Sequence, residues 1–294
     1  METLTELYCL VDDFYQAYEG TREARQLGDG KKRPGRKAVM SLSEQATILI
    51  LFHQSRYRDF KSFYTKYVEE HLRVEFPDRL SYGRFIQRLP GVRDLLAVFL
   101  QSLFGPCTGI SFIDSTPLAV CDIHRAANHR VFAQLAARGK TSMGWFFGFK
   151  LHLVVNDRGQ LLSLRVTPGN THDTKPVLSL TERLFGKLFG DKGYLGQQLQ
   201  EQLRTRKIHL ITPIRHNMKN RLVVMNDKLL LRKRVLIEAI IDQLKNVSQI
   251  EHTRHRSPAS FAVHLLSGLI AYSLQPKKPS LSWHHVNLAY AAIS

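Results

Sequence analysis

Strand-like and helical segments alternate along the second part of this chain, and their order limits the folds that it can adopt. Apolar, β-rich runs lie at residues 109–120, 144–155 and 160–168, in a segment ending at Asp191, and at 208–212. Apolar residues at helical spacing lie between the later runs, at about 174–185 and 196–204. The order β-β-β-α-β-α-β, with a turn signal at residues 156–159, predicts an α/β domain with a mixed five-stranded sheet and flanking helices.

The first 105 residues have a different pattern. Apolar residues at helical spacing, a capping box of Ser41 and Glu44, and a basic glycine-rich linker predict helices at about 3–18, 41–53, 57–72, from 81, and 91–105. We therefore expect a small all-helical N-terminal domain over residues 1–105, preceding a domain over residues 106–294. The short helices fit a helix-turn-helix unit that reads DNA, and they fit a generic helical domain equally well.

Positive charge is concentrated in the second domain. The formal net charge is +17, and residues 106–294 hold 26 Lys and Arg against 11 acids, whereas residues 1–105 hold 16 against 14. Basic segments lie at 122–144 and 213–234. This distribution favours nucleic acid as a partner. With no apolar stretch of spanning length and three scattered cysteines, we expect a cytoplasmic protein with reduced thiols and no membrane association.

Three acids lie in or at the end of the strand-like runs, or on the helix that follows the last of them. Asp114 lies in the first run, Asp191 ends the fourth, and Glu238 lies on a helix after the fifth. Acids at these places can converge at one edge of a sheet and hold two divalent ions, about 3.5 to 4 Å apart, for phosphoryl transfer. Mg²⁺ prefers such oxygen ligands. Each acid also has a structural interpretation: turn residues for Asp114 and Asp191, and an i,i+4 ion pair with Arg234 for Glu238.

Neighbouring residues carry weaker signals. At 3.6 residues per turn, Arg234, Glu238 and Lys245 share one helical face, which suits phosphate contacts or a solvated surface. Asp173 and Asp122 are spare candidates for the acidic site, although Asp173 better fits a cap of the following helix. Trp145, Lys150 and His152, on or beside a strand, are interpreted as structural.

The motifs resemble those of DDE transposases from bacterial insertion sequences. The resemblance rests on Asp114-Ser115-Thr116, on Asp191-Lys192-Gly193-Tyr194, and on Arg234, Glu238 and Lys245 at their spacing. The segments GFKLHL, PGNTHD and HTRHRSPASFAVHLLSGLIAY resemble the insertion-sequence nine-eight-two group in particular, over most of the chain. One position departs: Leu231 stands where relatives with a fuller third motif have tyrosine, which puts a phosphate-contacting tyrosine in doubt.

The resemblance implies an RNase H-like catalytic domain with a two-ion Mg²⁺ site, in which Mn²⁺ can substitute. Asp114 would bridge both ions, and Asp191 and Glu238 would each complete one shell. DNA contacts would come from residues near these acids, namely Lys192, Tyr194, Arg232, Lys233, Arg234 and Lys245, although packing beneath the sheet edge suits Tyr194 equally. The implied substrates are the element's terminal inverted repeats and target DNA, held by a homodimer or larger synaptic complex.

The implied activity is cleavage at the element ends followed by transfer of the 3′-OH into target DNA. Two alternatives stay open at this point. One is a catalytically inactive DNA-binding repressor of the element, and the other is an RNase H-like structure-specific nuclease.

Overall fold

A computed structural model describes residues 3–27, 39–55, 57–213, 224–252 and 254–281. The chain forms two compact units. The first comprises the described residues within 1–103, 244–251 and 255–276, and the second those within 104–243, 252–254 and 277–294. The predicted boundary gave all C-terminal helices to the second domain. The structure instead groups the helix at Pro258–Ser273 with the first unit, because it packs against helices there.

The described part of the first unit is helical. Its elements are α1 (Leu4–Leu27), α2 (Leu42–Gln54), α3 (Phe60–Phe63), a π-helical turn (Tyr64–Val68), α4 (Glu69–His71), α5 (Tyr82–Ser102) and α10 (Pro258–Ser273). Helix α10 packs against α2 and α5. The predicted capping box is confirmed, since the Ser41 hydroxyl accepts from the Glu44 N–H at 3.0 Å and the Glu44 carboxylate accepts from the Ser41 N–H at 2.6 Å.

Two helix predictions in this unit need correction. The helix predicted at 57–72 is interrupted by the π-helical turn. The two helices predicted from 81 and at 91–105 are one continuous helix, α5, with Pro90 inside it. Buried side chains along the length of α5, among them Phe85, Leu96 and Phe99, hold the helix together across the proline. The helix-turn-helix interpretation stays a prediction.

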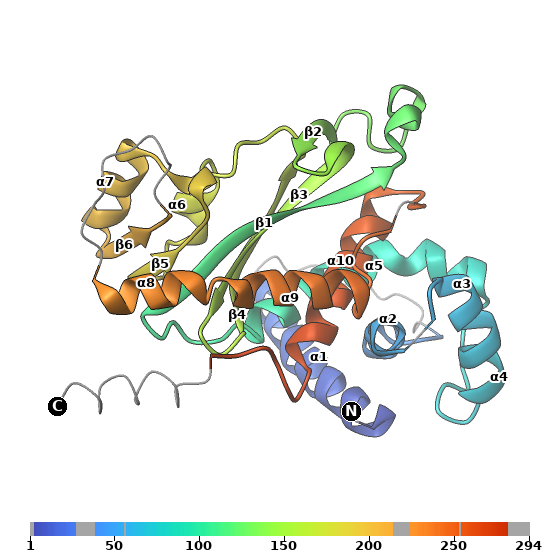
Figure 1. Cartoon of the computed structure of the whole chain (residues 1–294). Coiled ribbons are helices and arrows are strands. Elements are labelled where there is room, and N and C mark those ends of the chain that lie inside the picture. Colours follow the sequence, from blue (N-terminus) through green and yellow to red (C-terminus); the bar gives the residue numbers. More distant parts are fainter. Residues whose placement is uncertain (1–2, 28–38, 56, 214–223, 253, 282–294) are drawn as a thin grey trace. The chain divides into compact units, whose positions relative to one another are not determined.

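The second unit is built on a curved mixed sheet (Figure 1). Its strands are β1 (Ile110–Cys121), β2 (Ala137–Thr141), β3 (Gly144–Asn156), β4 (Leu161–Pro168), β5 (Gly186–Phe189) and β6 (Ile208–Ile211). The order is β2-β3-β1-β5-β6, and β4 also pairs with β3. Strands β2 and β4 share one edge of β3, because β2 pairs with its first five residues and β4 with residues from Phe149 onward. The described sheet thus has six strands, one more than predicted.

The sheet carries helices on its faces. These are α6 (Val177–Leu180), α7 (Gln197–Thr205), α8 (Met225–Arg232) and α9 (Val235–Asn246), with 3₁₀ turns at Ile123–Asn128 and Lys192–Tyr194. One face of the sheet packs on α6 and α7 through a core of Ile113, Val154, Leu162, Val177, Leu180, Leu188, Tyr194, Leu199, Leu203 and Ile208. Because side chains alternate along a strand, Asp114 points away from this core.

Candidate active site

Asp114, on β1, and Asp191, two residues after the end of β5, lie at equivalent positions along two neighbouring parallel segments of chain. Strands β1 and β5 pair in parallel with Phe112 opposite Phe189. Two residues further along each chain come Asp114 and Asp191, which therefore occupy equivalent positions. The Gly190 N–H still donates to the Ile211 carbonyl of β6, so the chain leaves the sheet only at Asp191. The parallel pairing explains why two acids 77 positions apart in the sequence meet at one edge.

Asp114 is the more enclosed of the two acids. Its Oδ1 accepts from the Ser115 N–H at 2.8 Å, and its Oδ2 accepts from the Arg234 guanidinium at 3.1 Å. Burial raises the pKa of Asp114 to about 6, with smaller raising contributions from Asp191 and Glu238, while Ser115 and Arg234 act against the rise. Both other predicted acids thus lie near enough to repel its charge.

Arg234 links the third acid to the first. It lies in the turn between α8 and α9, and its guanidinium donates to Glu238 at 2.5 Å as well as to Asp114. The i,i+4 ion pair with Glu238, which the sequence offered as a purely structural interpretation, is therefore present. It does not exclude the site, because the same arginine brings Glu238 to the sheet edge beside Asp114.

The donor chemistry of these acids suits a hard divalent cation. Three carboxylates provide only oxygen ligands, and their mutual repulsion calls for a neutralising charge. Among the described residues, however, no three His, Cys, Asp or Glu side chains come together closely enough to hold an ion. The Arg234 guanidinium instead supplies positive charge between Asp114 and Glu238. The residues fit Mg²⁺ or Mn²⁺ in kind, and Arg234 would have to give way.

The cations predicted to contact DNA divide into two groups. The first group is exposed to solvent and lies close to the acids along the sequence: Lys192, Arg232 and Lys233. Lys245 belongs to the first unit, where its amine pairs with Glu251 at 2.9 Å. Part of the predicted basic segment 213–234 lies outside the described residues, at positions 214–223.

Tyr194 lies in the core and exposes only 2% of its surface. Burial raises the pKa of its phenol above the ordinary value, and the nearby Asp114, Asp173 and Asp191 raise it further. The hydroxyl has no hydrogen-bond partner among the described residues. This placement matches the packing alternative and offers DNA no aromatic surface.

Asp173 has a different position from the predicted helix cap. Helix α6 begins only after Pro176 and has no side-chain cap. The Asp173 carboxylate instead accepts from the Ser115 hydroxyl at 2.8 Å and from the Lys150 amine at 3.0 Å. Ser115 follows Asp114 directly, so a residue set aside from the site is its close neighbour. In the sequence, a sign of this contact was the polar Ser115, which directly follows Asp114 within a mostly apolar strand.

A comparison with protein families finds a match over the residues that contain this site. A family model of the transposase DDE domain matches residues 104–258, a little over half of the chain. The chain belongs to the DDE transposase family. The match begins at the first residue of the second unit and includes Asp114, Asp191 and Glu238.

The other comparisons are less informative about this transposase. No curated protein matches its sequence. Among solved structures, it is similar to the piggyBac transposase in a synaptic complex with hairpin DNA, at 9% identity and a TM-score of 0.49, covering 90% of this chain and 71% of that one. Every helix in the described ranges is too short or too polar to cross a bilayer.

Proposed function

We propose that the chain is an active transposase of a bacterial insertion sequence, which cleaves DNA at the element ends and transfers the 3′-OH into target DNA. The observation that carries the proposal is the linkage of Asp114 to Glu238 through Arg234, with Asp191 near enough to Asp114 to raise its pKa, in the region that the transposase family model matches. The resemblance to the insertion-sequence nine-eight-two group supports the bacterial origin.

Asp114, Asp191 and Glu238 would hold two divalent ions, Mg²⁺ or Mn²⁺. Such ions supply Lewis-acid stabilisation of the attacking and leaving oxygens in phosphoryl transfer. The exposed Asp191 and the half-exposed Glu238 leave one side of the site open to a phosphate backbone. Asp114 is more enclosed, and its carboxylate, held by the Ser115 N–H, would be the least mobile of the three ligands. The strand order β4-β3-β1-β5-β6, with Asp114 on β1 and Asp191 just after β5, supports an RNase H-like catalytic domain.

DNA would approach over exposed cations near the acids. Lys192, Arg232 and Lys233 are the candidates for contacts with phosphates of the inverted repeats and of target DNA, and Arg234 would join them on leaving the acids. Because two element ends are processed together, we propose a homodimer or larger synaptic complex. Such a complex would act in the bacterial cytoplasm, at the nucleoid.

The decisive test is Glu238→Gln, which removes a ligand charge and keeps the side-chain shape. We expect Mg²⁺-dependent nicking of an end-bearing duplex to be lost, while the gel-shift affinity for that duplex stays close to that of the wild type. The matched control is Glu201→Gln, the same change at an exposed position on α7. Retained nicking in the Glu238 variant would remove this residue from the site, and lost nicking in the control would make Glu201 the third acid.

The same assay separates the two alternatives. A wild-type chain that binds element ends but never nicks them in Mg²⁺ or Mn²⁺ would be a repressor. A chain that nicks branched or random DNA equally well and joins no 3′-OH to a second duplex would be a structure-specific nuclease.

A further inference from the structure

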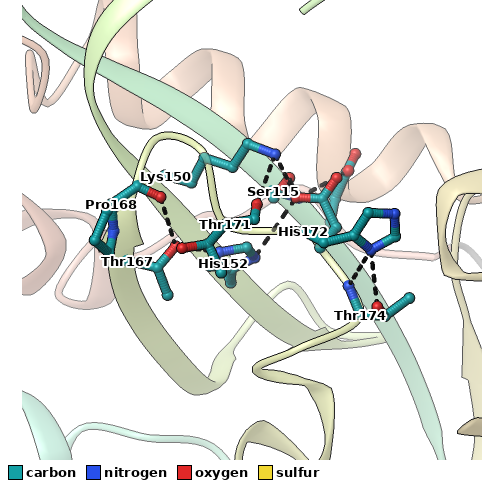
Figure 2. A network of polar contacts seen from close by, with 10 residues as sticks. Ser115, Lys150, His152, Thr167, Pro168, Thr171, His172 and Thr174 are labelled. Atoms are coloured by element: carbon teal, nitrogen blue, oxygen red, sulfur yellow. Dashed lines mark hydrogen bonds and ion pairs between the residues drawn. The ribbon is translucent and has the colours of Figure 1, made fainter. Parts of the chain in front are cut away.

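Side chains from two strands of the second unit converge on the Asp173 carboxylate. The Ser115 hydroxyl of β1 and the Lys150 amine of β3 both donate to its Oδ1, at 2.8 and 3.0 Å. The Lys150 amine also donates to the Thr171 carbonyl at 3.1 Å, which ties down the loop that carries Asp173. Figure 2 shows Lys150 reaching from its strand toward Ser115 and Thr171. The Lys150 and Asp173 side chains are 14% and 29% exposed, so this ion pair is largely shielded from water.

His152 lies on the buried side of the polar network formed by Ser115, Lys150 and Asp173. It is fully buried, its Nε2 lies 2.9 Å from the Thr167 hydroxyl, and its Nδ1 lies 4.0 Å from Asp173 Oδ1 (Figure 2). Burial, the main cause, lowers the pKa of His152 to about 4, so the ring is neutral at physiological pH. Lys150 is therefore the cation that balances Asp173, and the network carries no net charge.

Ser115 connects this network to the acidic site. Its hydroxyl donates to Asp173 on one face of β1, and its backbone N–H donates to Asp114 Oδ1 at 2.8 Å. In the sheet, Ser115 stands opposite His152 of β3. Asp114 and Ser115 point to opposite faces, because side chains alternate along a strand. Asp173 thus lies behind the strand that carries Asp114 and reaches the acid only through Ser115.

We propose that Asp173, held by Lys150, is a positioning residue that fixes Ser115 and thereby orients the Asp114 carboxylate for metal binding. The inference rests on the proposed function. A direct role in binding the same ions as Asp114 does not fit Asp173, because its carboxylate meets the Ser115 side chain, on the face of β1 opposite to the Asp114 side chain. A flexible carboxylate must lose conformational freedom when it binds an ion, and a fixed one has lost it already. Partners that orient metal ligands typically change metal affinity about 10- to 100-fold when they are removed.

The test measures binding of Mn²⁺ alone to the full-length protein by calorimetry, without DNA. We expect Asp173→Asn to weaken Mn²⁺ binding by about 10- to 100-fold, and to lower kcat for end nicking at a fixed Mn²⁺ concentration with an unchanged KM for DNA. The control is Asp122→Asn, an identical charge change at an exposed acid that caps the 3₁₀ turn after β1. It should bind Mn²⁺ as the wild type does.

A second variant guards against a folding defect. Ser115→Ala removes the hydroxyl that meets Asp173 and keeps the N–H that meets Asp114, so it should weaken Mn²⁺ binding to a similar degree. The variant that combines both substitutions should then bind Mn²⁺ no more weakly than either single variant, because both substitutions remove the same hydrogen bond. Rescue of Asp173→Asn by raised Mn²⁺ would support positioning, since a merely misfolded protein would not respond.

Wild-type Mn²⁺ affinity in either folded single variant overturns the inference. Failure of the proposed function is recognised in the wild type itself. If the wild type binds no Mn²⁺ and nicks no DNA, the proposed function is wrong, and the positioning role is wrong with it. If the wild type binds Mn²⁺ and Glu238→Gln does not, while Asp173→Asn binds normally, only the positioning role falls.

Discussion

Arg234 places its positive charge between two carboxylates, Asp114 and Glu238, which repel each other. Its guanidinium donates to Asp114 at 3.1 Å and to Glu238 at 2.5 Å, and only about a fifth of its side chain is exposed. An ion that binds these carboxylates must displace the arginine or accept its repulsion. The residue proposed to contact DNA phosphate thus also holds the acids in the absence of DNA.

Replacing Arg234 by Gln should therefore strengthen Mn²⁺ binding in the absence of DNA. We expect a gain of roughly tenfold, equivalent to about 1.4 kcal/mol, measured by calorimetry at pH 8 so that Asp114 stays ionised. Binding to an end-bearing duplex should weaken in the same variant. Arg232→Gln, an exposed cation on α8, is the control and should leave Mn²⁺ affinity unchanged. Weaker Mn²⁺ binding to Arg234→Gln would show that the arginine assists the metal.

The sequence singled out three acids, whose role as metal ligands stays a prediction, but it did not reveal the contacts that join them to other residues. Asp114, Asp191 and Glu238 stand out because few acids occur in a basic region and each follows a recognisable element. The contacts of Arg234 with Asp114 and of Asp173 with Ser115 join residues 120 and 58 positions apart. Such contacts depend on strand pairing across the sheet, which the local pattern does not contain. Tyr194 was ambiguous for the same reason, since a loop sequence does not reveal which side chain turns inward.

At the scale of elements, the segment between β1 and β3 was the hardest to predict. Strand β2 has the sequence ARGKT, without the alternation of apolar residues that marks a strand. It forms because Gly139 allows close approach: a Cβ there would lie 2.3 Å from the Gly169 carbonyl. Helix α6 is four residues long where twelve were predicted, because the chain before it is used by the Asp173 loop. The long strands β1, β3 and β4 were recognisable because their apolar runs are long.

Gly148 gives an element-scale prediction, since the backbone of β1 leaves no room for a side chain at this position of β3. A Cβ at this position would lie 2.0 Å from the Leu118 carbonyl oxygen, which is backbone and can move only with its strand. Gly148→Ala should lower the free energy of unfolding by about 3 kcal/mol or more, measured by urea denaturation. Gly193→Ala is the control, because no atom lies within 4 Å of its added Cβ. Equal stability of the two variants would contradict the close packing of these strands.

At the scale of the molecule, the chain passes from one compact unit to the other and back. The first division, between residues 103 and 104, coincides with the start of the family match and lies two residues from the predicted boundary. Residues 244–251 and 255–276 then belong with the N-terminal helices. A deletion that keeps only residues 104–294 would therefore leave the apolar faces of α10 without the helices on which they pack, whereas the sequence pattern suggested an independent second domain.

The described part of each unit contains a buried histidine that makes the folded state less stable in acid. Burial lowers the pKa of His53 in the first unit and of His152 in the second from the ordinary 6.5 to about 4. Between these values the unfolded chain binds a proton that the folded chain does not, so stability falls as the pH drops from about 6.5 toward 4. Asp114 has the opposite effect, because its pKa is raised from 3.8 to about 6 and its contribution to stability grows as the pH falls over that range.

His53→Gln should reduce this acid sensitivity. His53 Nδ1 lies 2.5 Å from the Ser248 carbonyl, and a glutamine amide can donate to the same acceptor without titrating. The free energy of unfolding, measured with urea at pH 7.5 and at pH 4.5, should drop by about 2 to 3 kcal/mol less in the variant than in the wild type, as expected for one group whose pKa falls from 6.5 to about 4. Asp114 titrates equally in both proteins and cancels from the difference. The exposed His124, replaced by Gln, is the matched control. An identical acid sensitivity in His53→Gln and the wild type would mean that His53 is protonated in the folded state, and that the first unit accommodates the charge.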